Sequence, residues 1–554
     1  MKITDTSDLW WKTAVIYCLD VETYMDWNGD GRGDIEGLSH RIDHLADLGV
    51  TCLWLMPFYP SPGKDDGYDI SGFYGVDAGI GDLGQFVELM RTAKDRGMRV
   101  IVDLVVNHTS DRHPWFRAAV NRPESEYRDY YVWRDEPPKK QQALVFPGEE
   151  TSVWNREPKS GQYYLHSFYR YQPDLNIANP RVRDEIARIM GFWLELGISG
   201  FRVDAVPFLI DLPDDVRGDP HDYLQDLRRF LQRRSSDAIL LGEVNLPYDE
   251  QLEYFGGSDD GASQLTMQFD FIGMQALYLS LARADARPIA KALRDRPPLP
   301  AEAQWANFVR NHDELTLDKL TDAERQEVFD AFGPEPEMQV YGRGIVRRLP
   351  SMLAGDPRRI RMVYSLLFSL PGTPVLFYGE EIGMAENLDV GGRRSVRTPM
   401  QWSADKNGGF SDAAPSRLVR RPPEGGFGPE FVNVIDQRHD PDSLYHFIQK
   451  LIERYRTSSE IGWGALEVLE HDDPAVLAHS VASDTGRMIA VHNFGPDATT
   501  VSLLIAGEPE DATLSDLLER GSTALGPRGR VELDVEPYGS RWLRVLRPGD
   551  GRLT

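Results

Sequence analysis

Eight short apolar segments, separated by helical patterns, constrain the fold of this chain more than any other feature. Alternation of strand and helix predicts parallel strands joined by right-handed crossovers. Eight such units predict a closed (β/α)8 TIM barrel of the α/β class, and a doubly wound sheet is the alternative. The apolar segments are 14–19, 51–56, 100–106, 200–203, 238–241, 266–269, 306–309 and 375–378, with amphipathic stretches such as 35–48, 83–96 and 182–196 between them.

Two irregular spacings and a change of pattern predict additions to the barrel. The segment 107–176 is long and rich in aromatic, proline and charged residues, which indicates a subdomain inserted after the third strand. A second insertion, 314–357, precedes the eighth strand, and both would lie on the catalytic face. From residue 465 to 554 short alternating runs predict an antiparallel β-sandwich domain. The barrel itself would then comprise residues 1–106 and 177–464.

Charge and cysteine content narrow the function classes. The net charge is −26, which argues against nucleic acid and anionic membrane partners because both need Lys and Arg for neutralisation. Two cysteines, Cys18 and Cys52, are no disulfide framework and fit a reducing compartment. The N-terminus has no apolar signal core, and no run approaches the roughly 18 apolar residues that span a bilayer. We therefore expect a cytoplasmic protein with a small, neutral substrate. The sequence leaves open whether the chain forms a homo-oligomer.

Acidic residues end three of the predicted strands. Asp204, Glu243 and Asp313 follow the fourth, fifth and seventh apolar segments, so their side chains should converge at the barrel mouth. Two carboxylates on either side of one bond are what glycoside cleavage needs. Each acid alone is more often a helix cap or a solvated loop residue, but three at strand ends with Arg and His neighbours favour a catalytic site. Arg202 lies two residues before Asp204 on the same strand face and is expected to lower the pKa of that carboxyl, whereas Glu243 needs a raised pKa.

Four segments, 103–108, 200–204, 242–243 and 311–313, resemble in order and spacing the signature segments of the α-amylase superfamily, glycoside hydrolase family 13. The resemblance extends from about residue 10 to residue 402. It implies a retaining enzyme that acts on α-glucosides. It implies that Asp204 is the nucleophile, Glu243 the acid/base and Asp313 a carboxylate that binds sugar hydroxyls. It also implies that two histidines, His108 and His312, bind sugar hydroxyls.

Further segments resemble the α-glucosidase and trehalose synthase branch of that family. The run 65–69 resembles a segment in which Tyr68 stacks on the glucose ring and Asp65 binds its 4-hydroxyl. Arg397 resembles the arginine that pairs with this aspartate and closes the pocket behind one glucose. A structural salt bridge is the alternative. The run 172–176 resembles the segment that closes the inserted subdomain in the same branch.

A loop after the first strand has oxygen-bearing side chains at alternate positions, with glycine at the bend, which is typical of sites for hard cations. It resembles the cation loop of the oligo-1,6-glucosidase and trehalose synthase branch. The resemblance implies a structural Ca²⁺ or Mg²⁺ that takes no part in the chemistry. The expected ligands are the side chains of Asp26, Asn28, Asp30 and Asp34 and the carbonyl of Arg32. An Asx-rich turn without metal is the alternative.

The overall likeness is greatest to the trehalose synthases, which interconvert maltose and trehalose. An α-glucosidase or transglucosidase acting on terminal α-glucose is the alternative. A non-catalytic binding member is disfavoured because all the signature acids are present. The chain departs from the trehalose synthase pattern at Cys18, Glu22, Val244, Gln268 and Asp270, and we expect the loops that carry these positions to border the acceptor half of the site.

Overall fold

The computed structural model describes residues 9–210, 219, 221–256 and 263–549. A closed barrel of eight parallel strands forms its centre, in the spatial order β1-β14-β10-β9-β8-β7-β3-β2. Each strand overlaps one of the eight predicted apolar segments, so the predicted TIM barrel is confirmed. The barrel strands are β1 (Ile16–Leu19), β2 (Cys52–Leu55), β3 (Arg99–Leu104), β7 (Gly200–Val203), β8 (Ile239–Gly242), β9 (Met267–Phe269), β10 (Gln304–Phe308) and β14 (Thr373–Phe377).

Helices between the strands cover the outside of the barrel, and their ends follow from local sequence. Helix α2 (Ile35–Leu48), for example, begins where the side chain of Asp34 accepts the N–H of Gly37. It ends at Gly49, whose φ of 99° is left-handed. The other long helices are α3 (Leu83–Asp95), α5 (Pro180–Glu195), α7 (His221–Arg234), α8 (Tyr248–Phe255), α9 (Phe271–Arg283), α10 (Arg287–Asp295), α13 (Pro357–Ser369) and α15 (Leu444–Arg456).

The segment between β3 and α5 carries its own small antiparallel sheet, in the order β4-β6-β5. Isolated bridges pair His108 with Asp174 and Tyr131 with Leu175, so the segment returns to the barrel close to where it left. This is the inserted subdomain expected for residues 107–176. Its elements are α4 (Pro114–Asn121), β4 (Trp133–Arg134), β5 (Trp154–Arg156) and β6 (Tyr163–Leu165).

The second insertion, between β10 and α13, contains a three-stranded sheet in the order β11-β13-β12. The last barrel strand, β14, is followed by a long irregular segment that reaches α14 (Val434–His439) and includes Arg393 and Arg397. The elements of the insertion are β11 (Leu315–Thr316), α11 (Asp322–Phe332), β12 (Gln339–Val340), β13 (Gly344–Ile345) and α12 (Leu349–Met352).

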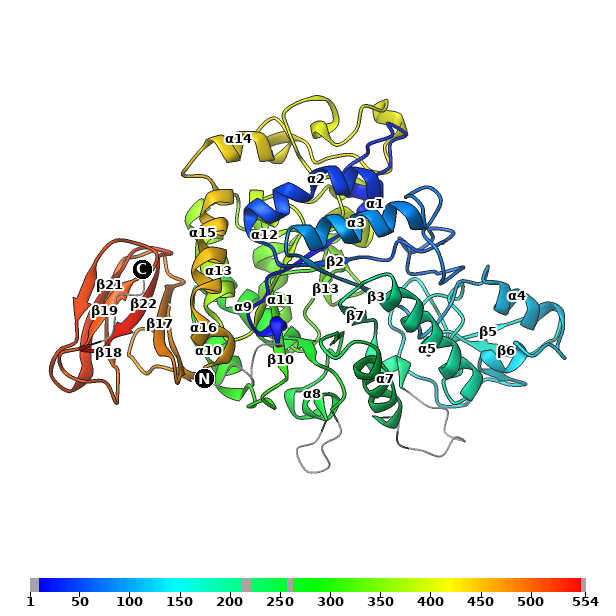
Figure 1. Ribbon diagram of the computed structural model, residues 1–554, viewed down its shortest axis with the longest axis horizontal. Coiled ribbons are helices and arrows are strands. Elements are labelled where there is room, and N and C mark those ends of the chain that lie inside the picture. Colours follow the sequence, from blue (N-terminus) through cyan, green and yellow to red (C-terminus); the bar gives the residue numbers. More distant parts are fainter. Residues whose placement is uncertain (1–8, 211–218, 220, 257–262, 550–554) are drawn as a thin grey trace.

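The C-terminal domain packs a six-stranded sheet, ordered β15-β16-β17-β22-β19-β20, on a two-stranded sheet of β18 and β21. Apolar side chains of both sheets share one buried cluster, as in a sandwich. Figure 1 shows this domain and the inserted subdomain at opposite ends of the molecule. Its strands are β15 (Ala465–Val468), β16 (Val476–Ser483), β17 (Gly486–Asn493), β18 (Thr499–Leu504), β19 (Thr513–Asp516), β20 (Ser522–Ala524), β21 (Arg530–Val535) and β22 (Ser540–Leu546).

Candidate active site

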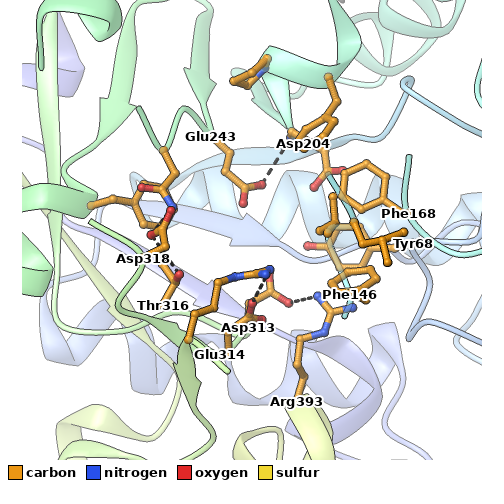
Figure 2. A pocket seen from close by; sticks show the side chains of 18 of the residues that line it. Tyr68, Phe146, Phe168, Asp204, Glu243, Asp313, Glu314, Thr316, Asp318 and Arg393 are labelled. Carbon is orange, nitrogen blue, oxygen red and sulfur yellow. Dashed lines mark hydrogen bonds and ion pairs between the residues drawn. The ribbon is translucent and has the colours of Figure 1, made fainter. Parts of the chain in front are cut away.

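Three carboxylates meet at the carboxyl end of the barrel strands, as the sequence predicts. Asp204 follows β7 directly, Glu243 follows β8, and Asp313 lies five residues beyond β10. Figure 2 shows the three side chains turned toward one cavity. Parallel strands bring their ends to one rim, which explains why residues so far apart in the chain become neighbours.

The guanidinium group of Arg202 bridges two of these acids, Asp204 and Glu243, and also contacts Asp103. Its Nη1 lies 2.5 Å from Oδ1 of Asp204 and 2.5 Å from Oδ1 of Asp103, and its Nη2 donates to Glu243. The Arg202 side chain is 1% exposed, so it is buried beneath the acids and does not line the cavity. One guanidinium bonded to both Asp204 and Glu243 favours a closely spaced pair, as retaining glycosidases have at about 5–5.5 Å. Trp54 Nε1 donates to Asp103 at 2.7 Å.

Burial sets the pKa values of the two candidate catalytic groups. It raises the pKa of Asp204 to about 6, although Arg202 opposes the shift. Arg202 lowers the pKa as expected, but the net shift is upward because the cost of burying the charge exceeds the attraction. Burial also raises the pKa of Glu243 to about 7, and the neighbouring Asp204 and Asp313 add to the shift. The order of the two values agrees with a nucleophile that is ionised and an acid that is protonated near neutral pH.

We expect kcat/KM to follow a bell-shaped pH profile centred between about pH 6 and pH 7. Below it Asp204 takes up a proton and ceases to be a nucleophile; above it Glu243 loses the proton that the leaving group needs. Because the two groups interact, the apparent values belong to the pair. The measurement is kcat/KM on maltose from pH 4 to pH 9. A profile flat across this range would contradict the assignment.

The third acid, Asp313, stays ionised. Burial works against its charge, but His312, Arg393 and Arg397 outweigh it and hold the pKa of this carboxyl well below its ordinary value. His312 Nε2 lies 3.0 Å from Oδ2 of Asp313, while Arg393 and Arg397 contact its Oδ1 at 2.6 and 3.0 Å. A permanently charged carboxylate at this place is suited to accept hydrogen bonds from sugar hydroxyls.

Tyr68 and His108 form part of one wall of the site, and His312 packs against Tyr68. The rings of Tyr68 and His312 stack with centroids 5.3 Å apart, and Tyr68 Oη lies 2.7 Å from His312 Nε2. His108 Nε2 lies 3.1 Å from the carbonyl oxygen of Tyr68. Burial lowers the pKa of both histidines to about 4, so both are neutral near pH 7. Tyr68 and His108 line the cavity, whereas His312 is fully buried behind Tyr68.

The partner of Asp65 differs from the one expected. Arg393 Nη2 lies 2.9 Å from Oδ1 of Asp65, and Gln172 Nε2 donates to Oδ2 at 3.0 Å. Arg397 instead contacts Asp66 at 2.6 Å and is only 1% exposed, so it supports the site from behind. The expected pairing of Asp65 with Arg397 is therefore wrong. The segment after β14 is irregular, so no periodicity could show which of its arginines reaches the cavity.

The cavity has a volume of about 520 Å³, within the usual range for small-molecule sites. Apolar side chains form much of its wall, and polar groups on the side of β8 and β11 complete it (Figure 2). The sequence patterns did not single out the apolar residues, because nothing distinguishes a wall residue from a core residue at that level. They include Leu144, Val145, Phe146, Phe168, Phe208, Leu246 and Phe271; the added polar residues include Asn245, Glu314, Thr316, Asp318, Arg343 and Arg393.

The departures from the trehalose synthase pattern do not lie on the cavity wall. Cys18 and Gln268 are buried in the barrel, Val244 is buried beside β8, and Glu22 pairs with Arg32 at 2.5 Å. None of these side chains lines the cavity, and the expectation concerned the loops that carry them. Their loops contribute other residues to the cavity, which are Asn245 and Phe271.

In the predicted cation loop, backbone N–H groups engage the oxygens of the expected ligands. Asp26 accepts from Gly29 and Gly31, and Asp34 accepts from Trp27, Asn28 and, at the start of α2, Gly37. Asn28 and Asp30 each accept a backbone N–H two residues on, from Asp30 and Arg32. Within the described part of the chain, no three His, Cys, Asp or Glu side chains gather closely enough to hold a metal ion. The loop as it stands is an Asx-rich turn, and the cation stays a prediction.

If the loop binds Ca²⁺, a chelator is expected to lower the melting temperature, because an ion bound to the folded state alone stabilises that state. Added Ca²⁺ should restore the melting temperature, and Asp30→Ala should abolish the response. The initial rate on maltose, measured below the melting transition, should stay unchanged. An identical melting curve with and without chelator would favour the metal-free turn.

Among residues 9–549, apart from the gaps given above, no helix combines the length and the apolar character needed to cross a bilayer.

The fold and the site define an enzyme that transfers or hydrolyses glycosyl groups. Residues 19–330 and 346–464 match the family described as "Alpha amylase, catalytic domain", and residues 486–544 match "Sucrose hydrolase-like, C-terminal domain". The chain belongs to the α-amylase family.

Relatives within that family are named trehalose synthase or glucosidase. The chain is 42% identical over 499 residues to "Trehalose synthase" from Thermus thermophilus, covering 88% of this chain but only 50% of that protein. It is 40% identical to "Trehalose synthase/amylase TreS" from Mycobacterium tuberculosis, covering 88% and 82% of the two chains. "Glucan 1,6-alpha-glucosidase" from Streptococcus pneumoniae is 32% identical, with 88% and 91% covered.

Solved structures extend the similarity to the whole fold. The α-amylase from H. orenii superposes with a TM-score of 0.78 at 26% identity, covering 96% of this chain and 99% of that one. A mutant isomaltulose synthase from Erwinia rhapontici in complex with sucrose superposes with a TM-score of 0.76 at 25% identity, covering 97% and 99%.

Proposed function

We propose that this enzyme interconverts maltose and trehalose by moving one glucosyl group within a closed pocket. The observation that carries the proposal is that the guanidinium of Arg202 bonds both Asp204 and Glu243, beside a cavity end at which Arg393 bonds both Asp65 and Asp313. We infer that these ion pairs seal this end of the cavity behind one glucose. The trehalose synthases among the relatives support the choice of substrates. The two free, buried cysteines support action in the cytoplasm.

The proposed reaction has two displacement steps. The carboxylate of Asp204 attacks the anomeric carbon of the terminal glucose, and the bond to the glycosidic oxygen breaks as Glu243 delivers its proton to that oxygen. The glucose released on the far side then turns, so that its 1-hydroxyl replaces its 4-hydroxyl next to Glu243. Glu243 takes the proton of this 1-hydroxyl while the hydroxyl oxygen attacks the anomeric carbon and displaces Asp204. The α,α-linked product forms, with Asp204 again a carboxylate and Glu243 again protonated.

Hydrolysis is the alternative second step, in which water replaces the released glucose. The glucosidases among the relatives favour this alternative. Incubation of the purified enzyme with maltose separates the two. Trehalose as the main product supports the proposal, glucose alone supports an α-glucosidase, and longer oligosaccharides support a transglucosidase.

The sealed end predicts a strong preference for disaccharides. Arg393 and Asp313 close the cavity next to Asp65, and a site whose buried polar groups bind a terminal hydroxyl rejects ligands that block it. Turnover of maltose is therefore expected to exceed that of maltoheptaose and soluble starch by a wide margin. Mid-length products from long chains would contradict the sealed end.

The variant Arg393→Ala tests the corrected pairing. It leaves Asp65 with Gln172 alone and should raise the KM for maltose and lower kcat, because binding energy far from the reacting bond is used to distort the ring. Arg394→Ala is the matched control, since that side chain is 45% exposed and does not line the cavity. Equal effects of the two substitutions would contradict the role given to Arg393.

A further inference from the structure

The tip of the β12–β13 hairpin holds a tyrosine in an unfavourable backbone conformation. Tyr341 has a φ of 56° and Gly342 a φ of 67°, and Arg343 N–H donates to the carbonyl of Val340 at 3.3 Å. This is a β-turn with both central residues left-handed, a conformation for which Asn, Asp or Gly is preferred at the first central position. A bulky residue in this conformation is strained and persists only where surrounding contacts compensate.

Those contacts come from the inserted subdomain. The ring of Tyr341 lies 4.9 Å from the ring of Phe146, which stacks on Tyr169 at 4.4 Å. The hydroxyl oxygens of Tyr169 and Tyr341 are 3.1 Å apart. The three residues, here called the aromatic clasp, join two insertions that are separate in the chain.

The clasp connects the walls of the cavity. Phe146 lines the cavity from the inserted subdomain, while Glu314 and Arg343 line it from the second insertion. The guanidinium carbon of Arg393 lies 4.9 Å from the Phe146 ring, and that of Arg343 lies 5.5 Å from the Tyr341 ring. Separation of the two walls therefore requires the clasp to break.

We propose that Tyr341, acting through the aromatic clasp, is a specificity-determining residue that favours transfer over hydrolysis by keeping the two insertions together over the glucosyl-enzyme. The inference rests on the proposed transfer reaction. While the walls stay joined, the released glucose remains beside Asp204 and bulk water is excluded. When they part, glucose leaves and water completes the second step. Tyr341 is a positioning residue, because it does not itself line the cavity.

The test measures how the glucosyl-enzyme divides between sugar and water. An aryl α-glucoside serves as donor and excess ¹³C-labelled glucose as acceptor, so the assay yields a transfer ratio whether or not the enzyme makes trehalose from maltose. Tyr341→Asn removes the ring and leaves a residue suited to the turn. Tyr538→Asn is the matched control, because Tyr538 also has a left-handed φ, of 54°, but lies in the C-terminal domain.

We expect Tyr341→Asn to lower the ratio of labelled disaccharide to free glucose several-fold while phenol release stays near that of the unmodified enzyme. Phe146→Ala should lower the ratio as well. Tyr341→Phe, which retains the ring, and Tyr538→Asn should both keep it. A ratio unchanged in both Tyr341→Asn and Phe146→Ala would overturn the inference. Failure to form trehalose from maltose would count against the proposed function and leave this result intact.

Discussion

Replacing Asp204 by Ala or Glu243 by Gln is expected to lower turnover of maltose by several orders of magnitude while leaving the fold intact. Asp204→Ala removes the attacking carboxylate, so no covalent intermediate forms. Glu243→Gln keeps the size of the side chain but has no proton to give, and general acid catalysis alone contributes about 10²–10⁴-fold. The measurements are kcat/KM on maltose and the melting curve of each variant.

An activated substrate separates the two roles. An aryl α-glucoside with an acidic phenol needs little protonation on leaving, so Glu243→Gln should still release phenol rapidly, whereas Asp204→Ala should not. Asp249→Ala, at an exposed acidic position on α8, is the control and should behave as the unmodified enzyme. Near-normal maltose turnover in either site variant would show that other carboxylates carry the reaction.

Arg202→Met is expected to destabilise the fold by about 3–5 kcal/mol near neutral pH, since removing one partner of a buried ion pair leaves uncompensated charge. The guanidinium contacts Asp103, Asp204 and Glu243, and its side chain is 1% exposed. Activity should be lost as well. Arg91→Met, at a largely exposed surface pair, is the control and should change little.

The loss should depend on pH in a definite direction. The pKa values of Asp103, Asp204 and Glu243 are raised to about 6, 6 and 7 in the folded protein, above their ordinary range near 4. The folded state thus holds more protons than the unfolded state, and the stability from these groups falls as pH rises from about 4 to 7. Without Arg202 the three values rise further. In urea unfolding, the free energy of unfolding of Arg202→Met should therefore differ less from that of the unmodified enzyme at pH 5 than at pH 8. A larger difference at pH 5 would contradict this account.

The repeat of apolar segments predicted the barrel, and the acidic residues that follow three of these segments predicted the carboxylates at its rim. Each barrel strand is apolar on both faces, so it appears in the sequence as a short continuous run. Parallel strands bring their carboxyl ends to one rim, so acids at those ends had to converge. The C-terminal domain was harder. The alternating runs indicated the domain without locating every strand; β16, for example, has six consecutive buried residues and so shows no alternation.

The sequence alone determined the fold class and the position of Asp204, Glu243 and Asp313 at the barrel rim, because strand geometry is local and repeats along the chain. Only the tertiary structure decided which side chains meet across long irregular segments. Arg393 and not Arg397 reaches Asp65, and Tyr341 reaches Phe146 in the other insertion. No period relates such residues, and their positions follow from how loops pack on a finished barrel. The pKa of Asp204 was likewise decided by burial, which depends on everything packed around the carboxyl.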